Sequence, residues 1–112
     1  MEGAVPVDLY NPGNDAWITP SVLNAVRAIP SNFTSPGQNI MNSDIEDAYP
    51  IARLLFYLVN RDNLLTNTVT FLTWCILQGQ LYVPIVGYVP INGTSAQSYS
   101  LDLVANLIQH IS

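Results

Sequence analysis

A single arginine, Arg53, stands before the apolar run at residues 54–59, Leu-Leu-Phe-Tyr-Leu-Val. A guanidinium offers several hydrogen-bond donors in one plane, so it pairs readily with a carboxylate or an oxyanion. We therefore predict that Arg53 faces a cleft or a hinge and binds an anion or a carboxylate. The alternative is a structural role, in which Arg53 binds Asp47 or a backbone carbonyl at the end of a strand.

Two other polar clusters have the side chains that ions require. Asp44, Glu46 and Asp47 could hold a calcium ion, but they lack the alternating oxygen ligands of an EF-hand loop. Residues 92–95, Asn-Gly-Thr-Ser, could present N–H and O–H donors to an anion. We interpret the first cluster as a solvated loop and the second as an ordinary turn, and we predict no metal site.

Nucleophilic chemistry has little support in this sequence. The chain has one histidine, His110, and one cysteine, Cys75, which are far apart in sequence. A zinc site needs several such ligands, and a Cys/His nucleophile needs the two side chains within hydrogen-bonding reach. We predict a protein that is not an enzyme and has no cofactor.

The longest apolar run, residues 69–91, is expected to organise the rest of the chain. Its first part has apolar residues on nearly every face of a helix, which predicts a helix buried on several sides and capped within residues 66–68. Gly79 is expected just beyond its C-terminal end. A kinked or 3₁₀ turn should follow at residues 80–86 and end at Gly87 with positive φ.

The other elements are expected to be strands and helices in alternation. Apolar residues at alternate positions or on both faces predict strands. Apolar residues three and four apart, between a capping residue and a proline or glycine, predict helices. These patterns predict an edge strand at residues 4–10 and a turn at 11–15. A helix at 20–29 should follow, capped by Thr19, with Val22, Leu23, Val26 and Ile29 on its apolar face. Beyond it we predict a loop at 30–48, a central strand at 51–60 and a last helix that begins after Ser98 or Ser100.

Composition indicates that part of the surface is covered by another molecule or by another part of the same protein. Of the 112 residues, 49% are hydrophobic and only 10% are charged, whereas about a quarter are charged in typical domains. Exposed apolar surface on this scale is typical of an interface. We therefore predict a single domain, residues 1–112, that either forms a homo-oligomer or belongs with an N-terminal lobe that this chain lacks.

Charge and hydropathy exclude two kinds of partner. The net charge is −5, with three arginines and no lysine, whereas nucleic-acid binding needs clustered cations. A membrane-spanning helix needs about 20 uninterrupted apolar residues, and glycines and prolines break the run at 69–91. We predict neither nucleic-acid binding nor a membrane span. No apolar h-region follows Met1, so we expect a trimmed chain or a partial reading frame.

Three sequence blocks occur in a specific order over residues 17–91. Thr-Pro-Ser at residues 19–21 precedes the first predicted helix, and Tyr-Pro-Ile-Ala-Arg at 49–53 precedes the central strand. The third block consists of Val69, Phe71, Leu72 and Trp74, then Gly79 and Gln80, then Gly-Tyr-Val-Pro-Ile at 87–91. The order and approximate spacing of the three blocks resemble the C-terminal segment of the phosphate-binding proteins of ABC transporters, which belong to the type II periplasmic-binding-protein superfamily.

The resemblance implies an α/β fold, namely part of a lobe with a short mixed sheet and three to four helices. In that family the chain crosses back to the first lobe near the second block, and the last helices pack on that lobe. The implied function is to bind inorganic phosphate in the periplasm or at the extracellular surface and to deliver it to an ABC permease. The family's anion-binding residues lie mostly before this segment, so Arg53 is the one ligand-binding residue carried over.

A different class of function remains open. The same apolar surface would suit a structural or interaction module that oligomerises without binding a ligand.

Overall fold

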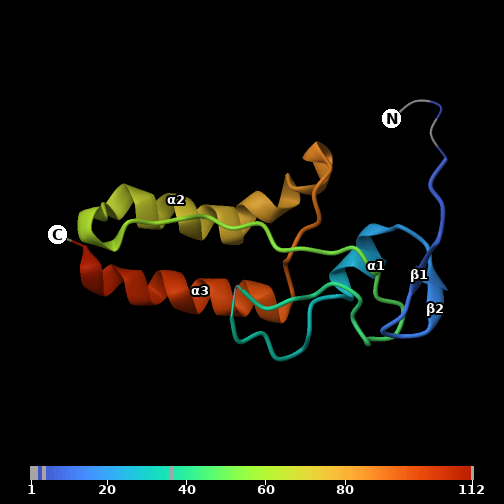
Figure 1. Ribbon diagram of the computed structural model, residues 1–112. Coiled ribbons are helices and arrows are strands. Elements are labelled where there is room, and N and C mark those ends of the chain that lie inside the picture. Colours follow the sequence, from blue (N-terminus) through green and yellow to red (C-terminus); the bar gives the residue numbers. More distant parts are fainter. Residues whose placement is uncertain (1–2, 4, 36, 112) are drawn as a thin grey trace. The chain divides into compact units, whose positions relative to one another are not determined.

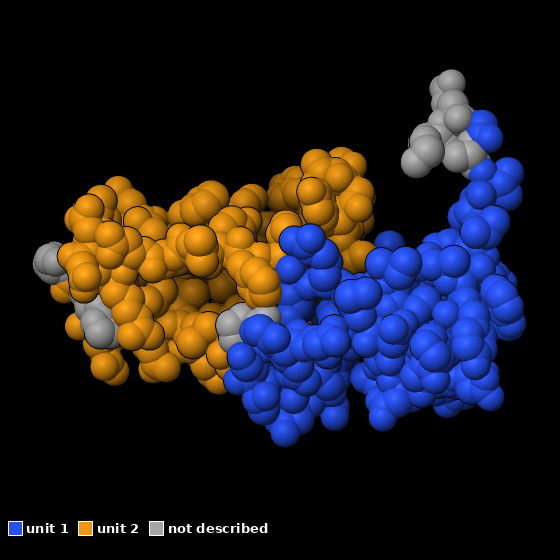
Figure 2. Space-filling model, viewed as in Figure 1, with its two compact units in different colours: residues 1–54 blue, residues 55–112 orange. Residues whose placement is uncertain are grey.

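The structure is a computed structural model that describes residues 3, 5–35 and 37–111. The chain forms two compact units, Met1–Leu54 and Leu55–Ser112 (Figure 2). The described residues contain a two-stranded antiparallel sheet, three α-helices and several 3₁₀ helices. The predicted combination of strands and helices is present, but the short mixed sheet is instead an antiparallel hairpin. The two units are described separately below.

In the first unit, strands β1 (Leu9–Asn11) and β2 (Ala16–Ile18) pair with Tyr10 opposite Trp17 (Figure 1). The turn between them was predicted, and Asp15 adopts positive φ within it. A hydrogen bond to the Asp15 carboxylate raises the pKa of Tyr10. Strand β2 was not predicted, because it is short and has no clear alternation. The strand predicted at residues 4–10 was too long: residues 5–8 have no regular structure, and residue 4 lies outside the described part.

A buried asparagine holds the hairpin to the loop at residues 42–48. Asn11 is fully buried, and its Nδ2 donates to the carbonyl oxygens of Ser43 (2.8 Å) and Ala48 (2.9 Å). Its Oδ1 accepts from the backbone N–H of Gly13 at 2.8 Å. Gly13 lies so close to the loop that a Cβ there would be 2.0 Å from the carbonyl oxygen of Asn42. This contact therefore requires both the amide of residue 11 and the absence of a side chain at residue 13.

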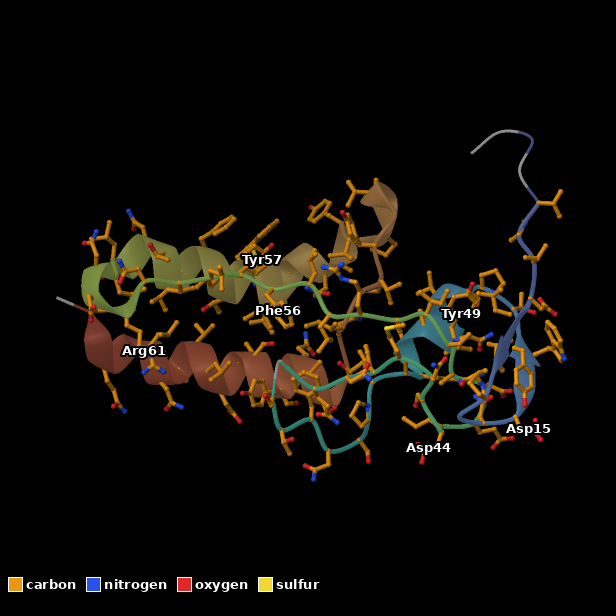
Figure 3. All side chains as sticks on the ribbon, viewed as in Figure 1. Asp15, Asp44, Tyr49, Phe56, Tyr57 and Arg61 are labelled. Atoms are coloured by element: carbon orange, nitrogen blue, oxygen red, sulfur yellow. The ribbon has the colours of Figure 1, made fainter. Side chains whose placement is uncertain are left out.

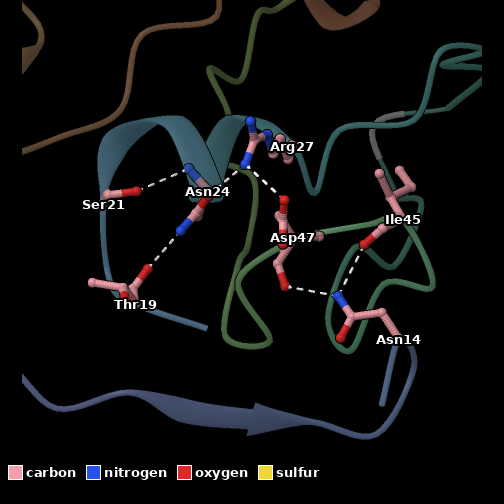
Figure 4. A network of polar contacts seen from close by, with 8 residues as sticks. Asn14, Thr19, Ser21, Asn24, Arg27, Ile45 and Asp47 are labelled. Atoms are coloured by element: carbon pink, nitrogen blue, oxygen red, sulfur yellow. Dashed lines mark hydrogen bonds and ion pairs between the residues drawn. The ribbon is translucent and has the colours of Figure 1, made fainter. Parts of the chain in front are cut away.

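Helix α1 (Val22–Val26) is shorter than predicted and begins at a different cap. The Oγ of Ser21 accepts from the N–H of Asn24 at 3.1 Å, so Ser21 and not Thr19 caps the helix (Figure 4). Val22 and Leu23 were predicted to face the core, but both are exposed. The core of this unit is formed instead by Ala28, just beyond α1, and by Ile40 and Ala48 of the loop that follows. Ile45, Ala52 and Leu54 are partly buried around them.

In the second unit, helices α2 (Thr66–Ile76) and α3 (Ser95–Leu107) lie side by side and antiparallel (Figure 1). Helix α2 was predicted, and it bears the first part of the long apolar run. The prediction that it is buried on several sides was wrong, because Val69 and Leu72 are its only fully buried residues among those described. They pack with Leu64 and Val104, and the partly buried side chains around them are those of Val59, Ile76, Leu107 and Ile111.

Both predicted end signals of α2 were wrong. Leu65 occupies the N-cap position and makes no side-chain hydrogen bond there. Gly79 is not in the left-handed conformation that follows many helices; it lies within the 3₁₀ helix η2 (Gln78–Leu81). A Cβ at Gly79 would lie 3.0 Å from Cζ3 of Trp74, so the absence of a side chain allows the close approach of this ring.

Two glutamines instead satisfy the carbonyl groups at the C-terminal end of α2. The Nε2 of Gln80 donates to the carbonyl oxygen of Cys75 at 2.8 Å, and its Oε1 accepts from the N–H of Ile91, also at 2.8 Å. The Nε2 of Gln97, from α3, donates to the carbonyl oxygen of Ile76 at 2.9 Å. The orphan carbonyls of a helix end thus bind side chains that also hold the next segments in place.

Helix α3 begins earlier than predicted. Thr94 is its N-cap, not Ser98 or Ser100, and the Thr94 hydroxyl accepts from the N–H of Gln97 at 3.4 Å. The Oε1 of Gln97 accepts from the N–H of Gly93 at 2.9 Å. This reciprocal arrangement is close to a capping box.

The turns between the helices follow the predictions more closely. The 3₁₀ helix η3 (Pro84–Val86) contains the proline that was expected to disrupt an α-helix, and Gly87 ends it with φ of 86°. A further 3₁₀ turn, η1 (Arg61–Asn63), precedes α2, and η4 (Ile108–His110) follows α3; the side chain of His110 lies outside the described part.

The strand predicted at residues 51–60 is absent. Residues 51–59 have no regular secondary structure and take part in no backbone–backbone hydrogen bond found among the described residues. The physical reason is the lack of a partner. A strand satisfies its N–H and C=O groups only through a neighbouring strand, and β1 and β2 pair with each other.

Gly87 provides a direct test of the turn after η3. We expect Gly87→Ala to lower the free energy of unfolding by about 1 kcal/mol, because an L-residue is strained at positive φ. No atom lies within 4 Å of the added Cβ, so the loss would be conformational rather than steric. The measurement is denaturant unfolding of both proteins. Gly37→Ala is the control, since Gly37 has no positive φ and meets only the Ser35 Oγ at 3.8 Å; equal stability of the Gly87 variant and the parent would contradict the assignment.

Candidate functional site

Arg53, the predicted ligand-binding residue, is exposed, and no hydrogen bond or ion pair is found for it among the described residues. The structural alternative, a bond to Asp47, is wrong. The Asp47 carboxylate lies 3.3 Å from Nη1 of Arg27, and the same Nη1 donates to the Oδ1 of Asn24 at 2.9 Å (Figure 4). The donors of Arg53 are therefore available to an external carboxylate or oxyanion.

The acidic cluster at residues 44–47 does not assemble into a cation site. Asp44 and Glu46 are exposed, and Figure 3 shows Asp44 at the outer edge of the loop. Asp47 is bound to Arg27. Within the described part of the chain, no three His, Cys, Asp or Glu side chains are grouped as metal ligands. The cluster is thus a surface loop in which one carboxylate fixes the loop to α1.

Residues 92–95 use their donors within the chain. The Thr94 hydroxyl donates to the carbonyl oxygen of Ile91 at 2.6 Å, and the N–H of Gly93 is bound by Gln97. Groups that are engaged in this way are not available to an anion without breaking the cap of α3. The geometry here is that of a turn that starts a helix.

The segment at residues 55–59, which we call the extended segment, lies along the α2–α3 hairpin (Figure 1). Val59 packs against the core of this unit, and Tyr57 lies beside the Cys75 thiol of α2. The negative charge of Cys75 in its thiolate form raises the pKa of Tyr57, and desolvation and a hydrogen bond to Cys75 raise it further. The segment is therefore held to the helices along one side.

Apart from Val59, the side chains of the extended segment are largely exposed to solvent. Leu58 is 99% exposed, and Leu55, Phe56 and Tyr57 are each more than half exposed; Figure 3 shows Phe56 and Tyr57 in this run. Large apolar side chains that are exposed next to one another mark interaction surfaces more often than single ones do. Sequence analysis placed these residues inside a sheet, so their exposure is a feature that only the structure reveals.

The outer face of α2 adds to this apolar surface. Phe71 is 58% exposed, and Trp74 is also exposed and stacks on Tyr82, with ring centroids 5.9 Å apart and an interplanar angle of 23°. Residues 63–101 contain no charged side chain. The resulting surface is apolar and neutral. It is formed by exposed residues of α2, of η2 and η3, and of the positions that flank η2: Phe71, Trp74, Leu77, Leu81, Tyr82, Ile85 and Val86. None of the helices in the described residues has the length and hydropathy that a membrane span requires.

A small cavity of about 110 Å³ lies beside Arg61 and is lined also by Leu103, Asn106 and Leu107. Arg61 is exposed, and none of the ion pairs found in the described part includes it. One guanidinium and one amide over two leucine side chains could hold a carboxylate at the surface. Sequence analysis could not predict this cavity, because its residues come from η1 and from the last turns of α3.

No protein-family model, curated protein or solved structure matches this chain. The candidate site is therefore defined by geometry. In the first unit it is the exposed Arg53, and in the second unit it is the extended segment together with the neutral apolar face of α2; the two are separate candidates.

Two adjacent residues of α2 lie in different environments, one in the core and one on the surface. Leu72 is 7% exposed and Phe71 is 58% exposed. We expect Leu72→Ala to lower the free energy of unfolding by about 2–4 kcal/mol, because it opens a cavity in the core. Phe71→Ala should cost less than about 1 kcal/mol. Urea unfolding followed by circular dichroism measures both, and a larger loss at Phe71 than at Leu72 would show that the apolar face is packed in solution.

Proposed function

We propose that this chain is the C-terminal segment of an extracytoplasmic phosphate-binding protein that delivers phosphate to an ABC permease. The observation that carries the proposal is the order of the three sequence blocks. Each block coincides with a structural boundary. Ser21 of the first block caps α1, the second block ends at Arg53 just before the extended segment, and Gly87 of the third block ends η3 in the left-handed conformation.

The exposed apolar surface supports the same proposal. In the family, the last helices pack on a lobe whose main sheet is absent from this chain. The neutral face of α2 and the extended segment provide the kind of surface that such packing would cover. A strand of the missing sheet would also satisfy the backbone groups of residues 55–59.

Arg53 is the residue that we propose contacts the anion or a carboxylate at its site. It is the only arginine within the three blocks that is exposed and without a partner among the described residues. Arg27, which follows the first block, is already bound to Asp47. The Arg53 guanidinium presents several donors in one plane, and it can bind an oxyanion without breaking an existing ion pair.

By itself, the chain is not expected to bind phosphate tightly. Tight binding needs several convergent donors in a closed cleft, and Arg53 is the one arginine within the three blocks. The net charge of −5 also opposes an anion, although salt screens this field beyond about 8–10 Å. Isothermal titration should give a dissociation constant weaker than about 10 μM, or roughly −7 kcal/mol. Tighter binding by this chain would contradict the requirement for a second lobe.

The proposal itself is tested with the longer protein that includes the coding sequence upstream of Met1. That protein should bind phosphate with a dissociation constant below about 10 μM, and Arg53→Gln should weaken binding by about tenfold or more, because a charge-assisted pair is lost. Arg61→Gln is the matched control, since Arg61 is also exposed but lies outside the three blocks. A longer protein that does not bind phosphate would overturn the proposal.

The second candidate is an interaction module that oligomerises without a ligand, and the exposed face of α2 favours it. In that case the chain should form a dimer at high micromolar concentration, measured by sedimentation equilibrium, because a symmetric contact covers the same patch on both copies. Phe71→Ser should shift the equilibrium towards monomer. A chain that stays monomeric at these concentrations would argue against this candidate.

A further inference from the structure

The connection between α2 and α3 exposes a continuous apolar run. Residues 81–89, which we call the apolar turn, read Leu-Tyr-Val-Pro-Ile-Val-Gly-Tyr-Val, and their only polar side-chain groups are two tyrosine hydroxyls. Eight of these nine residues are exposed, and only Val83 is half-buried. The exposed fraction is 75% for Leu81, 77% for Ile85 and 70% for Val86. A run of this length is unfavourable in water, which indicates that another apolar phase covers it.

The apolar turn lies at one end of the α2–α3 hairpin, and η1 and η4 lie at the opposite end (Figure 1). The second unit contains three Asp or Arg residues and no Glu or Lys: Arg61 and Asp62 belong to η1, and Asp102 belongs to the second half of α3. A protein partner that is recognised by its charges would find nothing to pair with at the apolar turn. The hydrocarbon of a bilayer, by contrast, requires a surface without charges.

The backbone of the apolar turn satisfies most of its own N–H groups. The N–H of Tyr82 donates to the carbonyl oxygen of Gly79 at 3.0 Å, and the N–H groups of residues 85–88 donate to the carbonyl oxygens of residues 82–84 at 3.1–3.3 Å. Pro84 has no N–H to satisfy. Unpaired backbone groups are costly in hydrocarbon, so a turn that pairs these donors internally is suited to leaving water.

Aromatic side chains accompany the aliphatic ones. Tyr82 and Tyr88 are 58% and 57% exposed, and Tyr82 stacks on Trp74 of α2 with ring centroids 5.9 Å apart. Tyr and Trp have an apolar ring and a polar group, and both are enriched where hydrocarbon meets water in membranes. The apolar turn therefore has the composition of an interfacial segment.

We propose that the apolar turn inserts into the surface of a zwitterionic lipid bilayer. Its aliphatic side chains would enter the boundary between headgroups and acyl chains, and its tyrosine hydroxyls would remain among the headgroups. The contact is interfacial and requires no spanning helix. The net charge of −5 opposes an anionic membrane surface, so the headgroups that fit are neutral overall.

The size of the apolar turn favours lipid over a second copy of the chain. A stable protein–protein interface takes about 20–30 residues on each side, whereas the apolar turn has nine residues. A lipid surface needs no complementary shape, and a few inserted side chains suffice for reversible binding. The inference goes beyond phosphate binding and does not depend on it, so the experiment uses no phosphate.

The experiment is cosedimentation of the full chain with phosphatidylcholine vesicles. We expect half of the chain to bind at or below about 1 mM accessible lipid, which is weaker than binding by one myristoyl chain, with its association constant of about 10⁴ M⁻¹. Ile85→Asp should weaken binding by about tenfold or more, because one inserted isoleucine is replaced by a charge. Val86→Thr keeps the shape of the side chain and should weaken binding by about threefold.

Ile108→Asp is the matched control, since Ile108 is also exposed, at 57%, but lies in η4 at the other end of the hairpin. This variant should bind vesicles like the parent, and circular dichroism checks that each variant is folded. No binding by the parent at about 5 mM lipid would overturn the proposal, as would equal losses in the two aspartate variants. Binding that occurs only with anionic lipid would also overturn it. So would a lipid-free dimer that Ile85→Asp dissociates and Ile108→Asp does not, since the apolar turn would then contact a second copy.

Discussion

An extended backbone cannot satisfy its own hydrogen bonds, and this constraint determines most of the structure. A helix pairs each N–H with a carbonyl of the preceding turn, so α2 and α3 form from local sequence. A strand depends on a partner. The described residues contain one pair of strands, β1 and β2, and these satisfy each other. Residues 51–59 have the composition of a strand and no partner, so they have no regular structure, and residues 55–59 lie unpaired along the helical hairpin of the second unit.

The same distinction explains which features the sequence could predict. The helix at residues 66–76, the 3₁₀ turn around Pro84 and the positive φ of Gly87 depend on periodicity, on a missing donor and on a missing side chain, which are all local properties. The caps were harder to predict. Ser21 rather than Thr19 begins α1, and Thr94 rather than a later serine begins α3, because several hydroxyl residues precede each helix and only the tertiary position of the chain selects one of them.

Contacts between distant residues were beyond sequence analysis altogether. Asn11 joins β1 to a loop more than thirty residues later through two carbonyl groups, and nothing in its immediate sequence distinguishes it from Asn14. Gln97 binds the end of α2 in the same non-local way. The ligand-binding role of Arg53 stays a prediction. The pairing of Asp47 with Arg27 was not predicted, because sequence proximity favoured Arg53 and the fold brings Arg27 within 3.3 Å of Asp47.

Anion binding and surface coverage place different demands on this chain. An oxyanion needs several donors that converge, and the chain offers one unpartnered guanidinium within the motif blocks, Arg53. The exposed apolar side chains of residues 55–59 and of the outer face of α2 need only a second apolar surface that covers them. Each interaction alone leaves the other unsatisfied. Under the proposed function, the other donors of the anion site would therefore come from outside this segment, because tight binding needs several donors that converge.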